Sequence, residues 1–239
     1  MGYHQQLQVC EKTPRCKEKV LQRGQLFSLN LYFLSILRPK LSVELGVYRG
    51  STFQLLHNFS TKAIGFDTGK DFGKGDYQKY WDQNWNIKVI DTKDITPSHF
   101  DNEQINFAHI DASHKFLDVI RDYETISNNL AVDGIICIDD YITHRDVFTA
   151  TNYFLREHRE FSLKFKGFDQ ASITRPEGAK LIDKVVSRFD NKILQTLKIE
   201  NTYSMNMIPT NHHTDVDFAI KTQSKISSDL KKFYKEFNA

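Results

Sequence analysis

Three aspartates and a histidine in the middle of the chain have the types and spacing to do chemistry. Asp111 is followed by Ala-Ser-His114, and the pair Asp139-Asp140 follows a later apolar run. Grouped carboxylates repel one another unless a cation compensates them, and such oxygens are the ligands that Mg²⁺, Ca²⁺ and Mn²⁺ prefer. Histidine titrates near neutral pH and can accept a proton. We therefore expect a divalent-metal site at Asp111, Asp139 and Asp140, with His114 as candidate catalytic base.

Less specialised roles for these side chains remain open at this point. One or two of the acids could cap helices, and Asp140 could do so for a helix after Thr143. His114 could be a helix-start residue bonded to a carboxylate.

The metal site requires that strands deliver these acids to one place. Residues 105–110 and 135–138 are short apolar runs typical of buried strands. Between them, apolar side chains recur at helical spacing, and Gly134 fits a helix stop or turn. These helical positions are Phe116, Val119, Ile120, Tyr123, Ile126 and Leu130. The unit is strand–helix–strand with a right-handed crossover, so both parallel strands release their acids at the same sheet edge, where open α/β folds bind ligands.

A glycine loop earlier in the chain predicts a second part of the site. Residues 41–45 read as a buried strand, and Gly46 and Gly50 then allow a tight turn and close approach to a ligand. Ser51 and Thr52 are expected to cap the following helix. A strand, a glycine loop and a helix N-terminus together present unpaired N–H groups, which suit a nucleotide-like cofactor carrying a carboxylate or phosphate.

An acid at the end of the next predicted strand supports this interpretation. Asp67 closes the run Lys62-Ala-Ile-Gly-Phe-Asp67 and lies 21 residues beyond Gly46. At about this distance from a glycine loop, an acid accepts hydrogen bonds from a ribose diol. An ordinary turn aspartate is the alternative.

The two motifs resemble those of a known family. Glu44-Leu-Gly-Val-Tyr-Arg-Gly-Ser-Thr52 resembles the E-x-G-x-x-x-G-x-[ST] pattern of motif I in class I methyltransferases, which use S-adenosylmethionine. The stretch from Asp111 to Asp140 resembles the D-[AG]-x-H…D-D pattern of small-molecule O-methyltransferases, including macrocin-type sugar methyltransferases and enzymes similar to the caffeoyl-CoA type. The resemblance covers about residues 40–175.

The resemblance implies an S-adenosylmethionine pocket and a metal held by Asp111, Asp139 and Asp140. Glu44 is expected to organise the glycine loop or meet the methionine amino group. The cofactor residues it implies are Glu44, Gly46, Tyr48, Gly50, Ser51, Asp67 and Asp111. Caffeoyl-CoA-type enzymes carry D-A-D-K where this chain has Ser113 and His114, so the identity of the base stays open.

We therefore expect a methyltransferase that methylates an oxygen of a small hydroxylated acceptor (a sugar, phenol or other natural product) with the help of Mg²⁺ or a similar ion. Two alternatives are a nucleic-acid- or protein-directed methyltransferase and a non-catalytic module with the same fold. The first is disfavoured, because N- and C-methylating nucleic-acid enzymes often carry an Asn/Asp-Pro-Pro-aromatic motif where Asp111-Ala-Ser-His114 stands here.

The expected fold class is α/β: a Rossmann-like, doubly wound, mostly parallel seven-stranded sheet with an antiparallel final strand, plus N- and C-terminal helices. Residues 162–167 and 171–175 would form its final hairpin. We expect an N-terminal helical segment at 1–38, a methyltransferase core at 39–178 and a helical C-terminal extension at 179–239 packed on the core. The apolar segment 18–38 leaves homodimer formation open.

Two further segments carry open alternatives. Residues 69–85 contain glycines together with Tyr77, Tyr80, Trp81 and Trp85, and form either a substrate lid or a surface helix with its aromatics packed inward. Residues 211–215 contain adjacent histidines near an acid, but adjacent side chains point apart on most backbones, which disfavours zinc binding there.

Composition limits the function classes. The chain has 239 residues and a formal net charge of +2, too mild for a nucleic-acid track or a membrane-bound face. The N-terminus lacks an apolar signal region and no run is long enough to span a bilayer. Three scattered cysteines, at positions 10, 16 and 137, favour a reducing cytoplasm.

Overall fold

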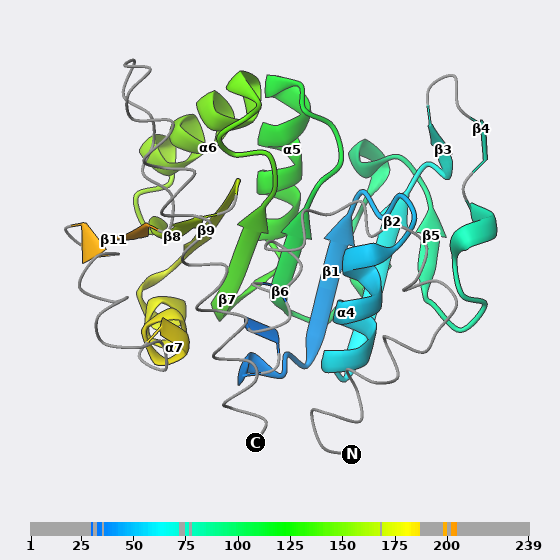
Figure 1. The fold of residues 1–239 in the computed structure, drawn as a ribbon, viewed down its shortest axis with the longest axis horizontal. Coiled ribbons are helices and arrows are strands. Elements are labelled where there is room, and N and C mark those ends of the chain that lie inside the picture. Colours follow the sequence, from blue (N-terminus) through cyan, green and yellow to red (C-terminus); the bar gives the residue numbers. More distant parts are fainter. Residues whose placement is uncertain are drawn as a thin grey trace, which may run out of the picture.

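The fold is built on one large sheet with helices on both faces (Figure 1). The structure is a computed structural model that describes residues 30, 33–34, 36–71, 75–76, 78–167, 169–186, 198–199 and 202–204. Residues 30, 33–34 and 36–37 are helical, which agrees with the helix expected before Pro39. The rest of the predicted segment 1–38, and residues 205–239, lie outside the described residues.

Seven strands form the expected methyltransferase-type sheet. Their spatial order is β5-β2-β1-β6-β7-β9-β8, or 3-2-1-4-5-7-6 when these strands are numbered along the chain. The first five strands are parallel, whereas β9 is antiparallel to both β7 and β8, so the predicted fold class is confirmed. The strands are β1 (Leu41–Leu45), β2 (Lys62–Asp67), β5 (Ile87–Val89), β6 (Ile105–Ile110), β7 (Leu130–Ile138), β8 (Ser162–Gly167) and β9 (Gln170–Thr174).

Two short strands extend the sheet beyond β8. β11 (Thr202–Ser204) pairs in parallel with β8, and β10 (Lys198–Ile199) pairs antiparallel with β11. They fall in the segment that the sequence assigns to a helical extension. Its first part is indeed a helix, α7 (Pro176–Val186), but hydrophobic periodicity alone did not reveal the strands.

The helices cover the two faces of the sheet in separate layers (Figure 1). On one face, α4 (Ser51–Phe59) and α7 pack with the helical residues Phe33 and Leu34. On the other, α5 (Phe116–Ser127) and α6 (Arg145–Glu157) bury their apolar stripes. With both faces covered, β1 is buried along its length, as its continuous run of buried residues shows.

Gly134 lies inside a strand, so its predicted role as a helix stop is wrong. Helix α5 ends at Ser127, and β7 already begins at Leu130, a residue that the periodicity placed in the helix. A Cβ on Gly134 would lie 2.6 Å from Cγ of Leu130 and 2.8 Å from the carbonyl oxygen of Ile105. The glycine thus permits close packing where the pairing of β6 and β7 shifts register.

The aromatic segment after β2 packs inward. It contains a small hairpin of β3 (Lys70–Asp71) and β4 (Gly75–Asp76), followed by the 3₁₀ turn Gln78–Tyr80 rather than a helix. Trp81 and Trp85 pack against the core cluster that contains α4. Inward packing, one of the two alternatives raised by the sequence, therefore describes these tryptophans.

No helix within the described part of the chain combines the length and apolar character needed to cross a membrane.

We predict that Gly134→Ala destabilises the fold by about 1–3 kcal/mol, because the added methyl group overpacks a closed core. Urea unfolding followed by circular dichroism measures this change. Leu117→Ala is the control, since Leu117 is 71% exposed and its loss should change stability by less than about 0.5 kcal/mol. Equal midpoints for wild type and Gly134→Ala would contradict this description of β7.

Candidate active site

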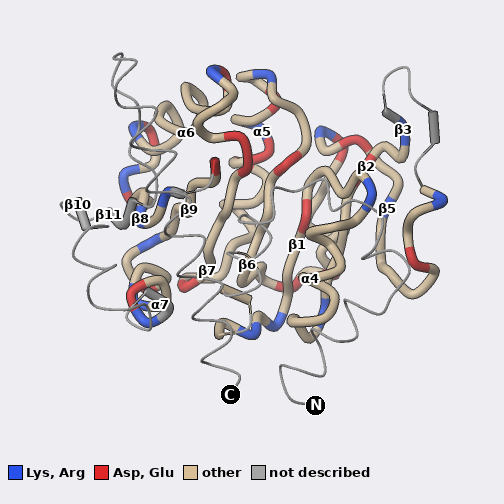
Figure 2. The backbone as a smooth tube through the Cα atoms, viewed as in Figure 1, with Lys and Arg blue, Asp and Glu red and all other residues tan. Residues whose placement is uncertain are grey.

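The acids predicted to act together lie at one edge of the sheet. Asp111 directly follows β6, and Asp139 and Asp140 follow β7, at the carboxyl ends of parallel strands. The strand pairing continues into these acids, because the Asp111 N–H donates to the Leu45 carbonyl at 2.8 Å and the Asp139 N–H to that of Ile110 at 3.0 Å. Figure 2 shows acidic segments gathered at this edge, where β1, β6 and β7 end.

The glycine loop meets this edge at Gly46. Gly46 has φ +83°, and a Cβ there would overlap the carbonyl group of Asp111 and approach Cα of Ala112. Only glycine combines this left-handed backbone with so close an approach. The chain leaving β1 is therefore pressed against the first residue of the acidic cluster, so the two motifs form one continuous site.

Asp67 holds the glycine loop in shape. Its buried carboxylate accepts the N–H groups of Val47 at 2.7 Å and Tyr48 at 2.8 Å through one oxygen, and that of Gly69 at 2.7 Å through the other. Tyr48 has φ +48°, an uncommon conformation for a bulky residue. The carboxylate thus stabilises a strained turn. Asp67 also lies at the end of β2, where the sequence predicts a ribose-binding acid.

The start of α4 differs from expectation. Gly50, with φ +83°, is the N-cap, and no side chain caps the helix, so capping by Ser51 and Thr52 is wrong. Gly50 is required because a Cβ would overlap the ring of Trp85. Trp81 supports the same loop by donating its indole N–H to the Tyr48 carbonyl. The N-cap residue therefore supplies no side-chain hydrogen bond to this helix N-terminus.

A buried ion pair lies under the loop on neighbouring strands. Glu44 of β1 and His109 of β6 are paired in register, with Oε1 and Nδ1 3.2 Å apart. Burial raises the pKa of Glu44 to about 7, with smaller opposing effects from His109. Burial disfavours the charged form of His109, but its hydrogen bond to Glu44 and the charge of Glu44 outweigh this and raise the pKa of the imidazole. Oε2 of Glu44 and Nε2 of His109 have no hydrogen-bond partner.

The carboxylates at the sheet edge perturb one another and His114. Burial, and then repulsion by Asp111, raise the pKa of Asp139 to about 7. Nε2 of His114 lies 3.0 Å from Oδ2 of Asp140 and 3.7 Å from Oδ1 of Asp111. These two carboxylates raise the pKa of His114 to about 10, and His114 in turn lowers the pKa of Asp140. With the carboxylates unscreened, His114 therefore holds its proton at neutral pH.

The turn after β7 depends on an acid that the sequence analysis missed. Oδ1 of Asp169 accepts the N–H groups of Ile142 at 2.7 Å and Thr143 at 2.9 Å, and its carbonyl accepts that of Tyr141 at 2.8 Å. Asp169 precedes β9, far along the chain from this turn, so only its position in the final hairpin could have signalled the role. It fixes a turn in which Asp140 adopts φ +56°.

Asp140 does not cap α6. The N-cap of that helix is His144, whose side chain forms no capping hydrogen bond. His144 instead stacks on His114, with ring centroids 4.2 Å apart. His144 was not among the predicted site residues, although it follows Asp140 by four residues.

Comparison with known proteins supports this fold and the segment that carries the acidic sheet edge. A family model described as a methyltransferase domain matches residues 43–141, which span the glycine loop and all three aspartates. No match was found among proteins with curated functions.

Several solved structures are similar at low sequence identity. Cofactor-bound Rv0187 from MTB has a TM-score of 0.51 and 11% identity, over 73% of this chain and 88% of that chain. The O-methyltransferase NovP has a TM-score of 0.49 and 14% identity, over 63% and 79%. CalS11, a TDP-rhamnose 3'-O-methyltransferase of calicheamicin biosynthesis, has a TM-score of 0.48 and 15% identity, over 72% and 91%. At these identities the likeness is one of fold.

The domain match, the 3-2-1-4-5-7-6 strand order and the glycine loop at the end of β1 all coincide in one part of the molecule. Residues 43–141 match a methyltransferase domain, and the chain is therefore an S-adenosylmethionine-dependent methyltransferase with a Rossmann-like fold.

Proposed function

We propose that this enzyme transfers the methyl group of S-adenosylmethionine to a hydroxyl oxygen of a small molecule, with a divalent cation held at the acidic sheet edge. The observation that carries the proposal is the contact of Gly46 with the backbone of Asp111. It brings the cofactor loop and the acids into one site, so that a methyl donor on the loop and an acceptor oxygen at the acids would be neighbours.

The residues around the loop fit the cofactor. The uncapped N-terminus of α4 at Gly50 and Ser51 offers N–H groups to a carboxylate. The unpartnered, buried Oε2 of Glu44 lacks a donor that an ammonium group would supply. We assign Glu44 to the methionine amino group and Asp67 to the ribose, with Tyr48 lining the pocket between them.

The sheet edge fits a cation of charge two. Burial raises the pKa of Asp139, and repulsion by Asp111 and, more weakly, by Asp140 raises it further. A divalent ion such as Mg²⁺ would compensate this repulsion, and we assign Asp111, Asp139 and Asp140 as its ligands. When bound, the ion would act as a Lewis acid that lowers the pKa of an acceptor hydroxyl.

The reaction is an in-line displacement. A bond forms between the acceptor oxygen and the methyl carbon, while the carbon–sulfur bond breaks and its electron pair remains on sulfur. The protein contributes alignment of the two reactants and removal of the hydroxyl proton. We assign His114 as the proton acceptor because of its position between Asp111 and Asp140. These carboxylates raise the pKa of His114, so the imidazole can accept a proton only when a bound cation compensates their charge.

The acceptor is proposed to be a small hydroxylated molecule such as a sugar or phenol. The pair of acids and the imidazole could bind one or two hydroxyl groups, and the described residues show no long basic track. We further propose that residues 179–239 pack on the core and shape the acceptor site, since β11 already pairs with β8.

Asp67→Ala is predicted to weaken binding of S-adenosylhomocysteine about 10- to 150-fold, the effect of losing hydrogen bonds to a charged group worth about 1.5–3 kcal/mol. Isothermal titration calorimetry measures the affinity. Asp101→Asn is the control, because Asp101 pairs with Lys62 away from the loop. This variant should bind S-adenosylhomocysteine as tightly as the wild type does. Equal affinity in Asp67→Ala and wild type would reject the assigned pocket.

Removal of divalent ions is predicted to abolish methyl transfer, and added Mg²⁺ or Mn²⁺ should restore it. The assay follows S-adenosylhomocysteine formation across a panel of sugars, phenols and polyols. Asp139→Asn should reduce kcat at least about 100-fold, while S-adenosylhomocysteine still binds, because the substitution removes a metal ligand and spares the loop.

Activity that is indifferent to a chelator would remove the metal from the proposal and leave the methyltransferase assignment intact. Cofactor binding without transfer to any acceptor would favour a non-catalytic role. Salt-dependent RNA or DNA binding, followed by transfer to the nucleic acid, would favour a nucleic-acid substrate.

A further inference from the structure

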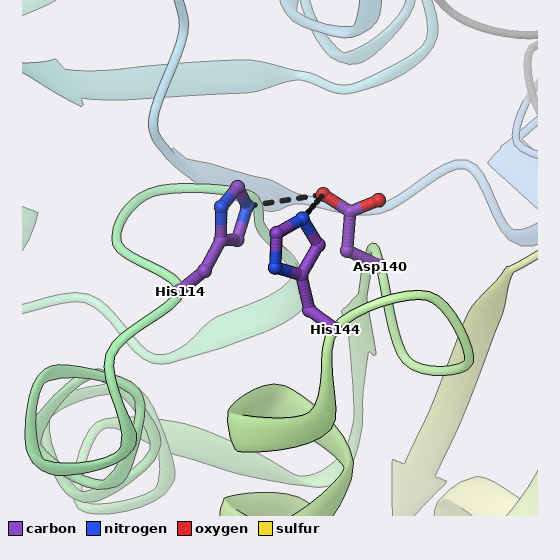
Figure 3. A group of neighbouring side chains, drawn as sticks. All are labelled: His114, Asp140 and His144. Carbon is purple, nitrogen blue, oxygen red and sulfur yellow. Dashed lines mark ion pairs between the residues drawn. The ribbon is translucent and has the colours of Figure 1, made fainter.

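Two imidazoles and one carboxylate converge beside the acidic sheet edge. His114 comes from the loop between β6 and α5, Asp140 from the turn after β7, and His144 from the start of α6 (Figure 3). Nε2 of His114 and Nε2 of His144 lie 3.0 Å and 3.9 Å from the same oxygen, Oδ2 of Asp140. One ligand atom from each of the three residues lies within 4.8 Å of the other two.

Hydrogen bonds among the three side chains themselves do not account for this arrangement. Nε2 of His114 is buried and has no hydrogen-bond partner, although it lies 3.0 Å from Asp140, so the contact is an ion pair without hydrogen-bond geometry. The His114 and His144 rings are stacked, with an interplanar angle of 23°. Two protonated imidazoles so placed would repel each other. In the neutral form the two imidazoles offer ligand atoms that lie, with an oxygen of Asp140, within 4.8 Å of one another.

The supporting residues orient the carboxylate toward the histidines. The Thr143 hydroxyl donates to Oδ1 of Asp140 at 3.1 Å, which leaves Oδ2 for the imidazoles. Thr143 is itself held by Asp169, whose Oδ2 shares the single hydrogen of that hydroxyl at the shorter distance of 2.7 Å. Hydrogen bonds of this kind to a ligating carboxylate are typical of metal sites, because they fix the orientation of the ligand.

The spacing and exposure suit a metal with open coordination positions. Four ligands at about 2.0–2.1 Å in a tetrahedron lie roughly 3.3 Å apart, and the two measured separations from Oδ2 of Asp140 are 3.0 Å and 3.9 Å. The side chains of Asp140, His114 and His144 are 27%, 37% and 48% exposed, so solvent and an acceptor can reach the site.

We propose that His114, Asp140 and His144 form a transition-metal site, for an ion of the Zn²⁺ or Co²⁺ class rather than Mg²⁺. Imidazole nitrogen favours these ions, whereas Mg²⁺ prefers oxygen ligands alone. The proposal rests on the metal assignment made under the proposed function, because Asp140 is common to both ligand sets. It changes the role of His114, because an Nε2 that binds the ion cannot also accept the proton of the acceptor hydroxyl. Asp111, whose Oδ1 lies 3.7 Å from Nε2 of His114, is the nearby carboxylate that could join the same ion.

The test is metal binding by the full-length protein without cofactor or acceptor. Chelator-treated protein is titrated with Co²⁺ and followed by its visible absorption, and with Zn²⁺ and Mg²⁺ by calorimetry. We expect Co²⁺ and Zn²⁺ to bind at least about 100-fold more tightly than Mg²⁺. His144→Ala should weaken Co²⁺ and Zn²⁺ at least about 10-fold and leave Mg²⁺ affinity unchanged.

Three further variants keep the result interpretable. His144→Asn retains a good N-cap for α6 and should lose metal affinity as His144→Ala does, which separates ligation from helix stability. His57→Ala removes an exposed histidine of α4, and a joint His212→Ala and His213→Ala variant removes the adjacent pair near the C-terminus. Both controls should bind Co²⁺ as the wild type does.

Wild-type affinity for Co²⁺ in both His144 variants would overturn the proposal, as would a site that binds Mg²⁺ as tightly as Zn²⁺. The outcome is separable from the proposed function. Methyl transfer supported by Mg²⁺ in a protein without Co²⁺ binding would retain the function and reject this site. Co²⁺ binding that depends on His144, in a protein that transfers no methyl group, would support this site and reject the proposed function.

Discussion

The close approach of Gly46 to the backbone of Asp111 is the constraint on which the rest of the structure depends. β1 and β6 are neighbours in the sheet, and the hydrogen bond from Asp111 to Leu45 continues their pairing to the last residue. Because Gly46 has no side chain, the loop after β1 can fold directly over the start of the acidic cluster. In the proposed function, a larger residue at this position would separate a cofactor on the loop from an acceptor at the acids.

Charge is concentrated at this junction and only partly compensated. Glu44 and His109 neutralise each other beneath the loop, yet each retains a buried polar atom without a partner. At the same edge, burial and then repulsion by Asp111 raise the pKa of Asp139, and His114 is shared between Asp111 and Asp140. Such uncompensated groups cost stability in an empty protein and become favourable only when ligands of the opposite charge bind.

Much of this arrangement was predictable because parallel strands follow a simple rule. Buried apolar runs ending in acids fixed β2, β6 and β7, and the parallel topology then required Asp67, Asp111 and Asp139 to emerge at one edge. The class of fold and the presence of the glycine loop therefore followed from local patterns, and the domain match confirms them.

Other features depend on contacts that sequence periodicity does not encode. Gly134 follows a helical pattern and so resembles a helix stop in the sequence. Its actual role is close packing against Leu130 and Ile105, a tertiary contact that the local pattern does not show. The N-cap of α4 is Gly50 rather than a serine, since the ring of Trp85 occupies the space beside it. Asp169 and His144 were not predicted because their contacts are tertiary. Asp169 binds the turn after β7 from the final hairpin, and His144 stacks on His114.

The central claim is that the cofactor loop and the metal-binding acids form one site, and paramagnetic relaxation measures it directly. Mn²⁺ is added to the protein saturated with S-adenosylmethionine carrying a ¹³C-labelled methyl group, in the absence of acceptor. The account predicts strong broadening of the bound methyl resonance by Mn²⁺, with none when Mg²⁺ replaces it. A methyl resonance that stays sharp while Mn²⁺ is bound would show that the ion and the cofactor lie apart, and would contradict the account.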